Sequence, residues 1–221
     1  LYWFKKDFGA RKLKGRTAIR YQGISHNFAP LDMPLAGDHQ KENLSLALAA
    51  CELLFDKFKS SRDKRYRLTP DLVRQGLKQT RWPGRLEIVK KDPLVILDGA
   101  HNLKAAKVLG NYLAQALSDK KITLVIGILD DKPHEAMLAH LLPRAHRLIL
   151  TRPRIDRSLP IETLKQAAQK LFKGQIEEIE DVKEAAAHAI QGTSKNDAVC
   201  IAGSLYVVGE AKEKLHMDFI S

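Results

Sequence analysis

The sequence contains few of the features that build disulfide-linked or membrane-spanning proteins. Only two of its 221 residues are cysteines, Cys51 and Cys200, and they lie far apart in apolar stretches. Two isolated thiols in such settings are typical of reduced core residues, which argues against a disulfide framework and favours the cytoplasm. No apolar run approaches the roughly 20 residues that a membrane-spanning helix needs. We therefore expect a cytoplasmic protein with no membrane partner.

Several common catalytic and nucleotide-binding motifs are also absent. The chain has no G-x-x-x-x-G-K-[ST] loop to cradle nucleotide phosphates and no G-x-G-x-x-G dinucleotide fingerprint. It has no G-x-S-x-G nucleophile elbow. The acids and histidines of residues 128–142 lack the spacing of a metal site, so we expect this chain to bind no metal. Asp130, Asp131 and Lys132 instead predict a loop with a solvated ion pair.

Positive charge is concentrated in the first part of the chain. Lysine and arginine outnumber the acids 37 to 26, which gives a net charge of +11. Residues 1–91 hold 20 basic and 9 acidic residues, whereas residues 92–221 hold 17 of each. This asymmetry suggests two physical units. The first either faces an anion (nucleic acid, polyphosphate or polycarboxylate) or carries a solvated basic surface.

The first unit reads as short strands followed by helices. Strands are predicted within residues 1–36, at LYWF (residues 1–4) and in RTAIRYQGI (residues 16–24). Residues 37–58 carry apolar side chains on a broad helical face, which predicts a helix. A few short strands cannot bury enough surface to fold alone, so we expect this region to be part of something larger.

Thr69 as an N-cap and Pro70 as a first helical residue predict a second helix. It ends before Pro83-Gly84, a pair that breaks regular structure. This break coincides roughly with the change in charge. We therefore place a domain boundary here, with one domain at residues 1–82 and another at residues 83–221.

The second domain alternates strands with helices. The strand candidates are residues 86–89, 94–97, 122–128, 147–150, 175–179 and 198–202, and the helical patterns are residues 102–117, 133–142, 160–172, 182–191 and 204–215. Nearly continuous apolar strands between helices predict an α/β fold with a mostly parallel, Rossmann-like sheet covered on both faces. The first two strands are joined only by KKDP, which predicts an antiparallel hairpin at one edge.

Ligands of such sheets bind at the carboxyl ends of the strands, so polar residues there are candidate site residues. Asp98 follows a buried strand, Gly99 permits a tight turn into the next helix, and Asn102 is well placed as the N-cap of that helix. A carboxylate at this point can accept both hydroxyls of a ribose, and His101 can donate to a substrate carboxylate. The alternative is that Asp98 and Asn102 only cap the turn and that His101 is an exposed loop residue.

Three further residues occupy places where ligands are commonly held. Arg85 follows a rigid Pro-Gly turn, where a guanidinium can contact phosphate with two hydrogen bonds. Asn43 lies near a helix start, where its amide can pair with an adenine edge or cap the helix. Ser204 follows a glycine at a helix N-terminus, which is a natural anion site, although a serine there is more commonly an N-cap.

Six stretches, taken in chain order, resemble successive blocks of the folylpolyglutamate synthase/dihydrofolate synthase family, a member of the Mur ligase superfamily. They are GDHQKENLSLALAA, WPGRLE, VILDGAHN, GILDDKPHEAML, LTRPR and AGSLYVVGEAK. The resemblance spans nearly the whole chain, and LDGAHN is its strongest element. An ordered series of this kind is far more specific than any single block.

The resemblance implies ATP-dependent formation of an amide bond. A folate or pteroate carboxylate is phosphorylated by ATP, and the amine of glutamate attacks the acyl phosphate. By similarity Asn43 would contact the adenine, Arg85 the phosphates and Asp98 the ribose. His101 and Ser204 would seat the incoming glutamate, with His101 the candidate catalytic residue. The implied partners are the small molecules ATP, folate and L-glutamate rather than nucleic acid, and the implied protein is a monomer.

The resemblance also implies that an important part lies outside this chain. The family's phosphate loop, magnesium ligands and most of its folate pocket belong to an N-terminal ATPase domain. Residues 1–82 resemble the C-terminal remnant of that domain, and residues 83–221 resemble the C-terminal Mur-ligase-type α/β domain. We expect the intact enzyme to use ATP and Mg²⁺, and we expect this fragment alone to be inactive.

Three other functions are compatible with the residues. A non-catalytic α/β module would bind a nucleotide or another protein through the crevice at the sheet's edge. A cell-wall Mur ligase would act on an amino acid or peptide in place of folate, although LDGAHN followed by GSLY points away from it. Nucleic-acid binding by residues 1–91 rests on charge alone, because no RNA-binding or zinc-finger signature accompanies it.

Overall fold

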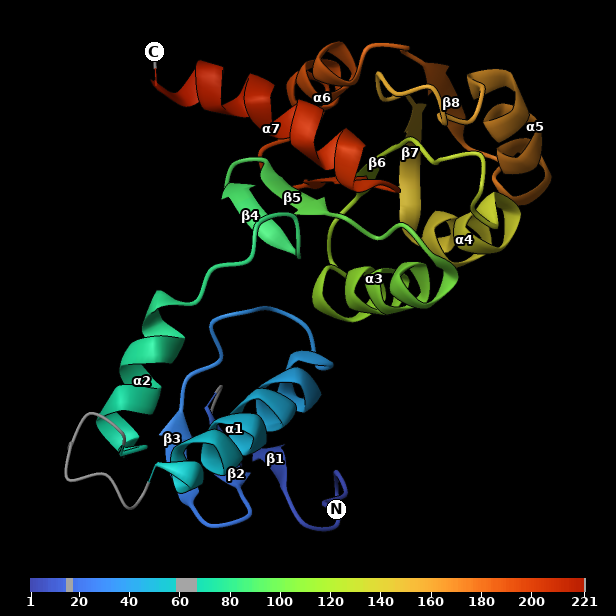
Figure 1. The fold of residues 1–221 in the computed structure, drawn as a ribbon. Coiled ribbons are helices and arrows are strands. Elements are labelled where there is room, and N and C mark those ends of the chain that lie inside the picture. Colours follow the sequence, from blue (N-terminus) through green and yellow to red (C-terminus); the bar gives the residue numbers. More distant parts are fainter. Residues whose placement is uncertain (15–17, 59–66, 221) are drawn as a thin grey trace. The chain divides into compact units, whose positions relative to one another are not determined.

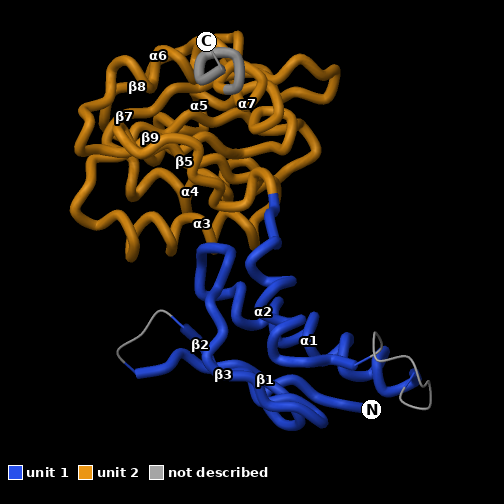
Figure 2. Tube along the Cα trace, turned by 90° about the vertical axis from the view of Figure 1, so that its left-hand side faces the viewer, with its two compact units in different colours: residues 1–82 blue, residues 83–221 orange. Residues whose placement is uncertain are grey.

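The computed structural model describes residues 1–14, 18–58 and 67–220, with the side chains described as far as residue 215. The chain forms two compact units, Leu1–Trp82 and Pro83–Ser221 (Figure 2). Within the described residues, every helix is too short or too polar to cross a bilayer. The two thiols are free, and Cys200 is buried.

Unit 1 is a small antiparallel sheet with two helices (Figure 1). The strands pair in the order β1-β2-β3. Their bounds, and those of the helices, are β1 Gly9–Lys12, β2 Ile19–Gln22, β3 Asn27–Leu31, α1 Gln40–Lys57 and α2 Pro70–Gln79. The core of the unit is a cluster of buried residues from the sheet and both helices: Phe8, Ile19, Tyr21, Phe28, Leu31, Leu48, Ala49 and Val73.

The strand expected at residues 1–4 is wrong. Only an isolated bridge joins Phe4 to Phe8, because the chain turns sharply just after Trp3. The backbone N–H of Asp7 donates to the carbonyl of Trp3 at 2.8 Å, and the N–H of Trp3 donates to the Asp7 carboxylate at 2.7 Å. Lys5 takes a positive φ of 69° within this turn. A run of aromatic residues therefore precedes a turn rather than forming a strand.

One face of α1 is fixed to the sheet by a buried carboxylate. The side chain of Glu52 has no exposed surface, and its two oxygens accept the backbone N–H groups of Ile24 at 2.6 Å and His26 at 2.9 Å. These donors lie in the turn between β2 and β3. Hydrogen bonds to an ionised group are stronger than neutral ones, so Glu52 holds the hairpin turn against the helix. The predicted cap of α2 is confirmed, because the Thr69 hydroxyl accepts the Leu72 N–H at 3.2 Å.

Unit 2 is a six-stranded sheet with helices on both faces. Its strands are β4 Glu87–Lys90, β5 Leu94–Asp98, β6 Ile122–Ile126, β7 Ala145–Leu150, β8 Gln175–Glu178 and β9 Ala198–Ala202. They pair in the order β4-β5-β9-β6-β7-β8. Only β4 and β5 are antiparallel, and every other neighbouring pair is parallel. The predicted α/β class, with its parallel sheet and antiparallel edge hairpin, is confirmed.

Alternate side chains of the strands build two apolar layers. Val95, Val125 and Val199 point toward the layer of α6 and α7, with which they share one buried cluster. Because successive side chains on a strand point to opposite faces, Ile96 and Leu124 point toward the layer of α3 and α4 (Figure 1). The helices are α3 Leu103–Ala116, α4 His134–Leu141, α5 Ile161–Leu171, α6 Val182–Gln191 and α7 Leu205–Ile220, with a 3₁₀ turn, η2, at Leu142–Arg144.

The helix boundaries follow capping residues that are visible in the sequence. The Asn102 side chain accepts the Ala105 N–H at 2.9 Å at the start of α3, as predicted. The Asp181 side chain accepts the Glu184 N–H at 2.9 Å at the start of α6. Such caps satisfy backbone donors that would otherwise lack partners. The first four predicted helices of this unit lie within one residue of the observed bounds, and α7 extends five residues farther than predicted.

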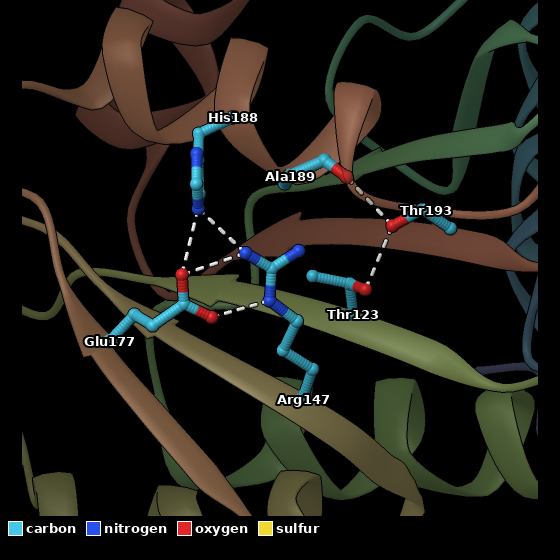
Figure 3. Close-up of polar contacts among 6 residues, drawn as sticks. All are labelled: Thr123, Arg147, Glu177, His188, Ala189 and Thr193. Carbon is cyan, nitrogen blue, oxygen red and sulfur yellow. Dashed lines mark hydrogen bonds and ion pairs between the residues drawn. The ribbon is translucent and has the colours of Figure 1, made fainter.

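Charged side chains attach the edge strand β8 to β7 and α6 (Figure 3). Glu177 accepts two hydrogen bonds from the Arg147 guanidinium, at 2.5 Å from Nε and 2.7 Å from Nη2. His188 of α6 places its Nε2 at 2.7 Å from the same carboxylate. Beside this group, the Thr193 hydroxyl joins Thr123 of β6, at 2.9 Å, to the carbonyl of α6 residue Ala189, at 2.7 Å.

Candidate functional site

The carboxyl ends of four parallel strands lie level at one edge of the unit 2 sheet. Asp98 of β5 is the register partner of Ala202 in β9, Ala202 is the partner of Ile126 in β6, and Ile126 is the partner of Leu150 in β7. The chain after β5 enters α3 on one face of the sheet, whereas the chain after β9 enters α7 on the other. Neighbouring strands whose chains leave in opposite directions leave a crevice in which ligands bind.

Asp98 is half-buried at this edge and is held by the neighbouring hairpin strand. Its Oδ2 accepts the backbone N–H of Leu86 at 2.9 Å. The backbone N–H of Gly99 donates to the carbonyl of Gly84 at 2.6 Å. These two bonds tie the Pro-Gly turn to the end of β5. Arg85 is exposed within this turn, and its positive charge acts on the Asp98 carboxylate.

The turn that carries Arg85 has an unusual backbone. Gly84 has a φ of +67° and Leu86 a φ of +47°. The left-handed region suits glycine, but it is uncommon for leucine and costs free energy. Leu86 is held there because its side chain is only 5% exposed and its N–H bonds to Asp98. Strain of this kind, supported by specific contacts, is found in loops that position functional groups.

Burial raises the pKa of the Asp98 carboxyl, and this is its largest perturbation. The backbone N–H groups of Leu86 and Ala100 oppose the rise, as do the charges of Arg85 and His101. The carboxylate is therefore partly desolvated while it is surrounded by donors and cations. Such a group gains from hydroxyl or cationic ligands, because they replace the water that it has lost.

His101 has a defined tautomer because of its own backbone. Its Nδ1 lies 2.8 Å from the carbonyl oxygen of Gly99, which can only accept, so Nδ1 carries the proton. When the ring is neutral, Nε2 is an acceptor. His101 is half-buried at the loop between β5 and α3. Its ring is therefore held by a hydrogen bond, in contrast to the freely exposed loop residue of the alternative interpretation.

Ser204 begins α7 on the adjacent strand β9. Its hydroxyl oxygen accepts the N–H of Tyr206 at 3.1 Å, and the residue is only 1% exposed. The hydroxyl thus acts as a helix cap.

Glycines allow three backbones to approach one another next to Ser204. Gly203 has a φ of +102°, and a Cβ there would lie 2.5 Å from the carbonyl oxygen of Gly127. A Cβ on Gly127 would lie 2.7 Å from the carbonyl oxygen of Thr151. Neither distance is compatible with a side chain. The strand ends therefore present bare backbone at this edge of the sheet.

Asn43 belongs to unit 1 and does not cap its helix. It lies within the first turn of α1, whose N-cap position is occupied by His39 without a side-chain hydrogen bond. The Asn43 Nδ2 donates to the Gln40 side chain at 2.9 Å. The capping alternative is therefore excluded for this residue.

Asp131, one of the two acids that follow β6, forms ion pairs. Asp131 lies 2.6 Å from the Lys132 ammonium and 3.7 Å from the Arg157 guanidinium, which confirms the predicted ion pair. Among the residues that the structure describes, no three histidine, cysteine or acidic side chains gather in a way that could hold a metal ion.

A separate cavity of about 540 Å³ lies beyond the ends of β7 and β8. It is lined by residues 152–156 and by Glu180, Asp181 and Glu184. Arg154 pairs with Asp181 at 2.6 Å, and its backbone N–H donates to Glu210 at 2.7 Å. The cavity is lined by residues other than Asp98, His101 and Ser204.

Sequence reasoning found the side chains of this edge but missed their backbone partners. The Leu86 N–H and the Gly84 carbonyl orient the Asp98 loop, and the pairing of Glu87 with Lys212 at 2.5 Å ties β4 to α7. The Pro-Gly pair signals a turn, but no local pattern predicts a left-handed leucine. Nor does any local sequence pattern predict that Lys212 pairs with Glu87, which lies 125 positions earlier.

Comparison with known proteins agrees with this architecture. Residues 84–205 match the family described as Mur ligase, glutamate ligase domain. A folylpolyglutamate synthase of Mycobacterium tuberculosis, solved with ADP, is 27% identical with a TM-score of 0.82 and covers 96% of this chain. The folylpolyglutamate synthase of Thermotoga maritima is 33% identical with a TM-score of 0.79 and covers the whole chain.

The relatives are considerably longer than this chain. The match covers 48% of the Mycobacterium chain and 49% of the Thermotoga chain. A probable bifunctional folylpolyglutamate synthase/dihydropteroate synthase of Halobacterium salinarum is 33% identical over 188 residues, which are 85% of this chain and 22% of that protein. The chain thus spans less than half the length of these relatives. It belongs to the Mur ligase family, and within that family it is similar to the C-terminal portion of folylpolyglutamate and dihydrofolate synthases.

Proposed function

We propose that this chain is the C-terminal part of an ATP-dependent ligase that joins glutamate to folate or to dihydropteroate. The observation that carries the proposal is the Asp98 carboxylate, which lies at the strand-end crevice beside Arg85 and His101. The family match over residues 84–205 and the ADP bound to the Mycobacterium relative support a nucleotide as the ligand.

Each side chain has a role that follows from its chemistry. The Asp98 carboxylate accepts hydrogen bonds from the ribose hydroxyls of ATP, and Arg85 contacts the phosphates of ATP. Asn43, which belongs to the other unit, is proposed to contact the adenine. His101 and Ser204 seat the incoming glutamate at the start of α7, where helix N–H groups favour a carboxylate.

The reaction proceeds in two steps. The γ-phosphoryl group of ATP is transferred to a carboxylate oxygen of the folate, which gives an acyl phosphate and ADP. The glutamate nitrogen then attacks the acyl carbon, the C–N bond forms, and the C–O bond to phosphate breaks. The nitrogen loses a proton, and Nε2 of neutral His101 is the proposed acceptor. The developing negative charge is stabilised by fixed cations and donors.

Phosphoryl transfer also needs groups that we place outside this chain. Magnesium and the phosphate-binding loop are proposed to belong to the N-terminal half of the intact ligase. When bound, the metal neutralises charge on the transferring phosphoryl group. The intact protein is proposed to be cytoplasmic and monomeric. The chain alone is expected to have no ligase activity.

The proposal is tested in a chimera in which this chain replaces the matched C-terminal portion of the Thermotoga maritima synthase. We expect ATP- and glutamate-dependent elongation of folate, and we expect Asp98→Asn to raise the KM for ATP at least tenfold. An unchanged KM would remove Asp98 from the site. The isolated chain serves as a second assay, and turnover by it above background would contradict the need for the N-terminal half.

One alternative has a specific observation in its favour. If this chain is instead a module that binds a different ligand, we expect that ligand to lie in the cavity between residues 152–156 and the start of α6. Its lining carries both arginines and acids, which suits a zwitterion better than a nucleotide. Binding of a free amino acid such as L-glutamate that is insensitive to Asp98→Asn but lost in Arg154→Gln would favour this second function.

A further inference from the structure

One side of helix α7 packs along the backbone segments that carry the proposed nucleotide ligands, beside β5 (Figure 1). Leu205, Val208 and Lys212 are spaced by three and four positions, so they lie along this one side of the helix. The Leu205 side chain lies against Gly99, because a Cβ on Gly99 would collide with it. A Cβ on Gly84 would lie 2.9 Å from Cγ1 of Val208. Two of the three residues therefore pack directly on the backbone of the candidate site.

The third residue, Lys212, reaches the Pro-Gly turn through a carboxylate. Its ammonium lies 2.5 Å from Oε1 of Glu87. The other oxygen, Oε2 of Glu87, accepts the backbone N–H of Gly84 at 2.7 Å. The side chains of Lys212 and Glu87 are only 23% and 25% exposed, so solvent screens this pair less than it screens a surface pair. One carboxylate therefore connects α7 to the turn.

The same contacts extend to the proposed phosphate ligand. Arg85 lies between Gly84, whose N–H donates to Glu87, and Leu86, whose N–H donates to Asp98 at 2.9 Å. The backbone on both sides of Arg85 is thus held by a carboxylate acceptor, and such charge-assisted bonds are strong. The Arg85 residue itself is exposed. The direction in which its guanidinium projects therefore depends on how firmly this backbone is held.

The two residues of the ion pair come from distant parts of the chain and have no role in the proposed function. Glu87 ends the stretch WPGRLE, and Lys212 ends the stretch AGSLYVVGEAK, 125 positions later. Removing one partner of a partly buried pair leaves a charge without compensation. A Glu87 carboxylate without its ammonium gains by turning toward water, and the Gly84 N–H then loses its acceptor.

We propose that Lys212 is a positioning residue of the nucleotide site. Through Glu87 it holds the Pro-Gly turn, and so it fixes the direction in which Arg85 presents its guanidinium to a nucleotide phosphate. The proposal rests on the proposed function for the identity of the ligand, and it rests on the observed contacts for the positioning. The Lys212 ammonium acts on the turn and does not contact the phosphates.

The positioning is tested first in the 221-residue chain without a ligand, by hydrogen exchange of single amides followed by NMR. Lys212→Met keeps an unbranched side chain and removes the ammonium. We expect the Gly84 amide to exchange at least about tenfold faster in this variant, because its acceptor is no longer held in place. Lys212→Arg keeps the cation and should restore slow exchange. Unchanged exchange at Gly84 in Lys212→Met would overturn the proposal.

Lys183 provides the matched control. Its ammonium lies 2.8 Å from Glu213 of the same helix α7, and its side chain is 29% exposed. Lys183→Met therefore removes a comparable ion pair of α7 that does not involve the Pro-Gly turn, and exchange at Gly84 should stay as it is in the unsubstituted chain. Equal acceleration in Lys183→Met and Lys212→Met would mean that a general loosening of α7 is the cause, which contradicts a positioning role.

The consequence for the ligand is measured by calorimetric titration with ADP. Lys212→Met is expected to weaken ADP binding at least about fivefold, and to have no further effect in a chain that already carries Arg85→Gln, because the guanidinium that it positions is then absent. Glu87→Gln combined with Lys212→Met should likewise bind no more weakly than Lys212→Met alone. Equal losses with and without Arg85 would mean that Lys212 acts through its own charge, and the proposal would be wrong.

Failure of this proposal differs from failure of the proposed function. If exchange at Gly84 depends on Lys212 but the unsubstituted chain does not bind ADP, the turn is held as described and the nucleotide assignment is wrong. If ADP binds and Asp98→Asn weakens it, while Lys212→Met changes neither Gly84 exchange nor ADP affinity, the nucleotide site stands and the positioning role is wrong.

Discussion

The Asp98 carboxylate is proposed to contribute to ligand binding, whereas its burial lowers the stability of the folded chain. Its carboxyl pKa is raised, chiefly by burial, so the ionised form is less favourable in the folded chain than in the unfolded one. The penalty is present at neutral pH and disappears as the pH falls through the raised pKa, because the folded state then takes up a proton. A ligand that donates hydrogen bonds to the Asp98 carboxylate would offset this cost.

Asp98→Asn therefore gives the first prediction. Asparagine keeps the acceptor for the Leu86 N–H and removes the desolvated charge. We expect the free energy of unfolding at pH 7 to stay the same or rise by up to about 1 kcal/mol, while ATP affinity falls at least tenfold. Urea denaturation and calorimetric titration measure the two quantities. A loss of stability of several kcal/mol would show that Asp98 is a structural residue.

Gly203 provides the second prediction. An alanine there would have to adopt a φ of +102° and place its Cβ 2.5 Å from the Gly127 carbonyl oxygen. We expect Gly203→Ala to lower the free energy of unfolding by about 2–4 kcal/mol. The matched control is Gly209→Ala in α7, where a Cβ meets nothing within 4 Å and alanine favours the helix by about 1 kcal/mol. Equal effects of the two substitutions would contradict the close approach of β9 to β6.

At the level of elements, β8 depends on charged side chains for its attachment. It is an edge strand of four residues, and Glu177 joins it to both β7 and α6 (Figure 3). Hydrogen bonds from Arg147 and His188 lower the pKa of Glu177 from 4.5 to about 2, with those of Arg147 the larger cause. Both partners of the Arg147–Glu177 pair are mostly buried, with side chains 16% and 21% exposed.

Glu177→Gln tests this attachment through its pH dependence. Because the folded pKa lies below the unfolded one, the stabilisation is complete above about pH 5 and is lost as the pH falls toward 2. We expect the variant to be about 2–3 kcal/mol less stable at pH 7 and the difference to shrink between pH 5 and pH 2. Denaturation curves at several pH values measure it.

The control for Glu177 is an exposed ion pair of the same chemistry. Glu135 lies 2.9 Å from Lys170, with side chains 60% and 68% exposed. Exposed pairs contribute little because water and salt screen them, so Glu135→Gln should leave the stability nearly unchanged at every pH. A pH-independent loss in Glu177→Gln would mean that packing, rather than the carboxylate charge, holds β8.

The elements of unit 2 were largely predictable from the sequence because local signals agree with the final packing. Caps at Asn102 and Asp181 and uninterrupted apolar strands mark the boundaries directly. The strand prediction for residues 1–4 is wrong because aromatic residues favour strands in general, whereas here the Asp7 side chain accepts a hydrogen bond that closes a turn. The left-handed Leu86 was beyond prediction, since its conformation depends on a carboxylate twelve residues later.

At the scale of the whole molecule, the two units differ in how many of their apolar side chains are buried within the unit itself. Unit 2 has two apolar layers around one sheet, and its candidate site is assembled from its own strand ends. Unit 1 has a small core and leaves Leu46, Leu53 and Leu54 of α1 exposed. The positive charge predicted to face an anion lies mostly in unit 1. The ligase that we propose would act on substrates that carry phosphates and carboxylates, and positive charge on unit 1 suits such substrates.

The most direct test of the central claim is a titration of the ¹⁵N-labelled chain with ADP, followed by NMR. The account predicts that amide shifts change at Gly84–Leu86 and Asp98–Asn102, the two segments joined at the strand-end crevice, and that Asp98→Asn abolishes the changes. Shifts confined to residues 152–156 and the start of α6, or none with millimolar ADP, would contradict it.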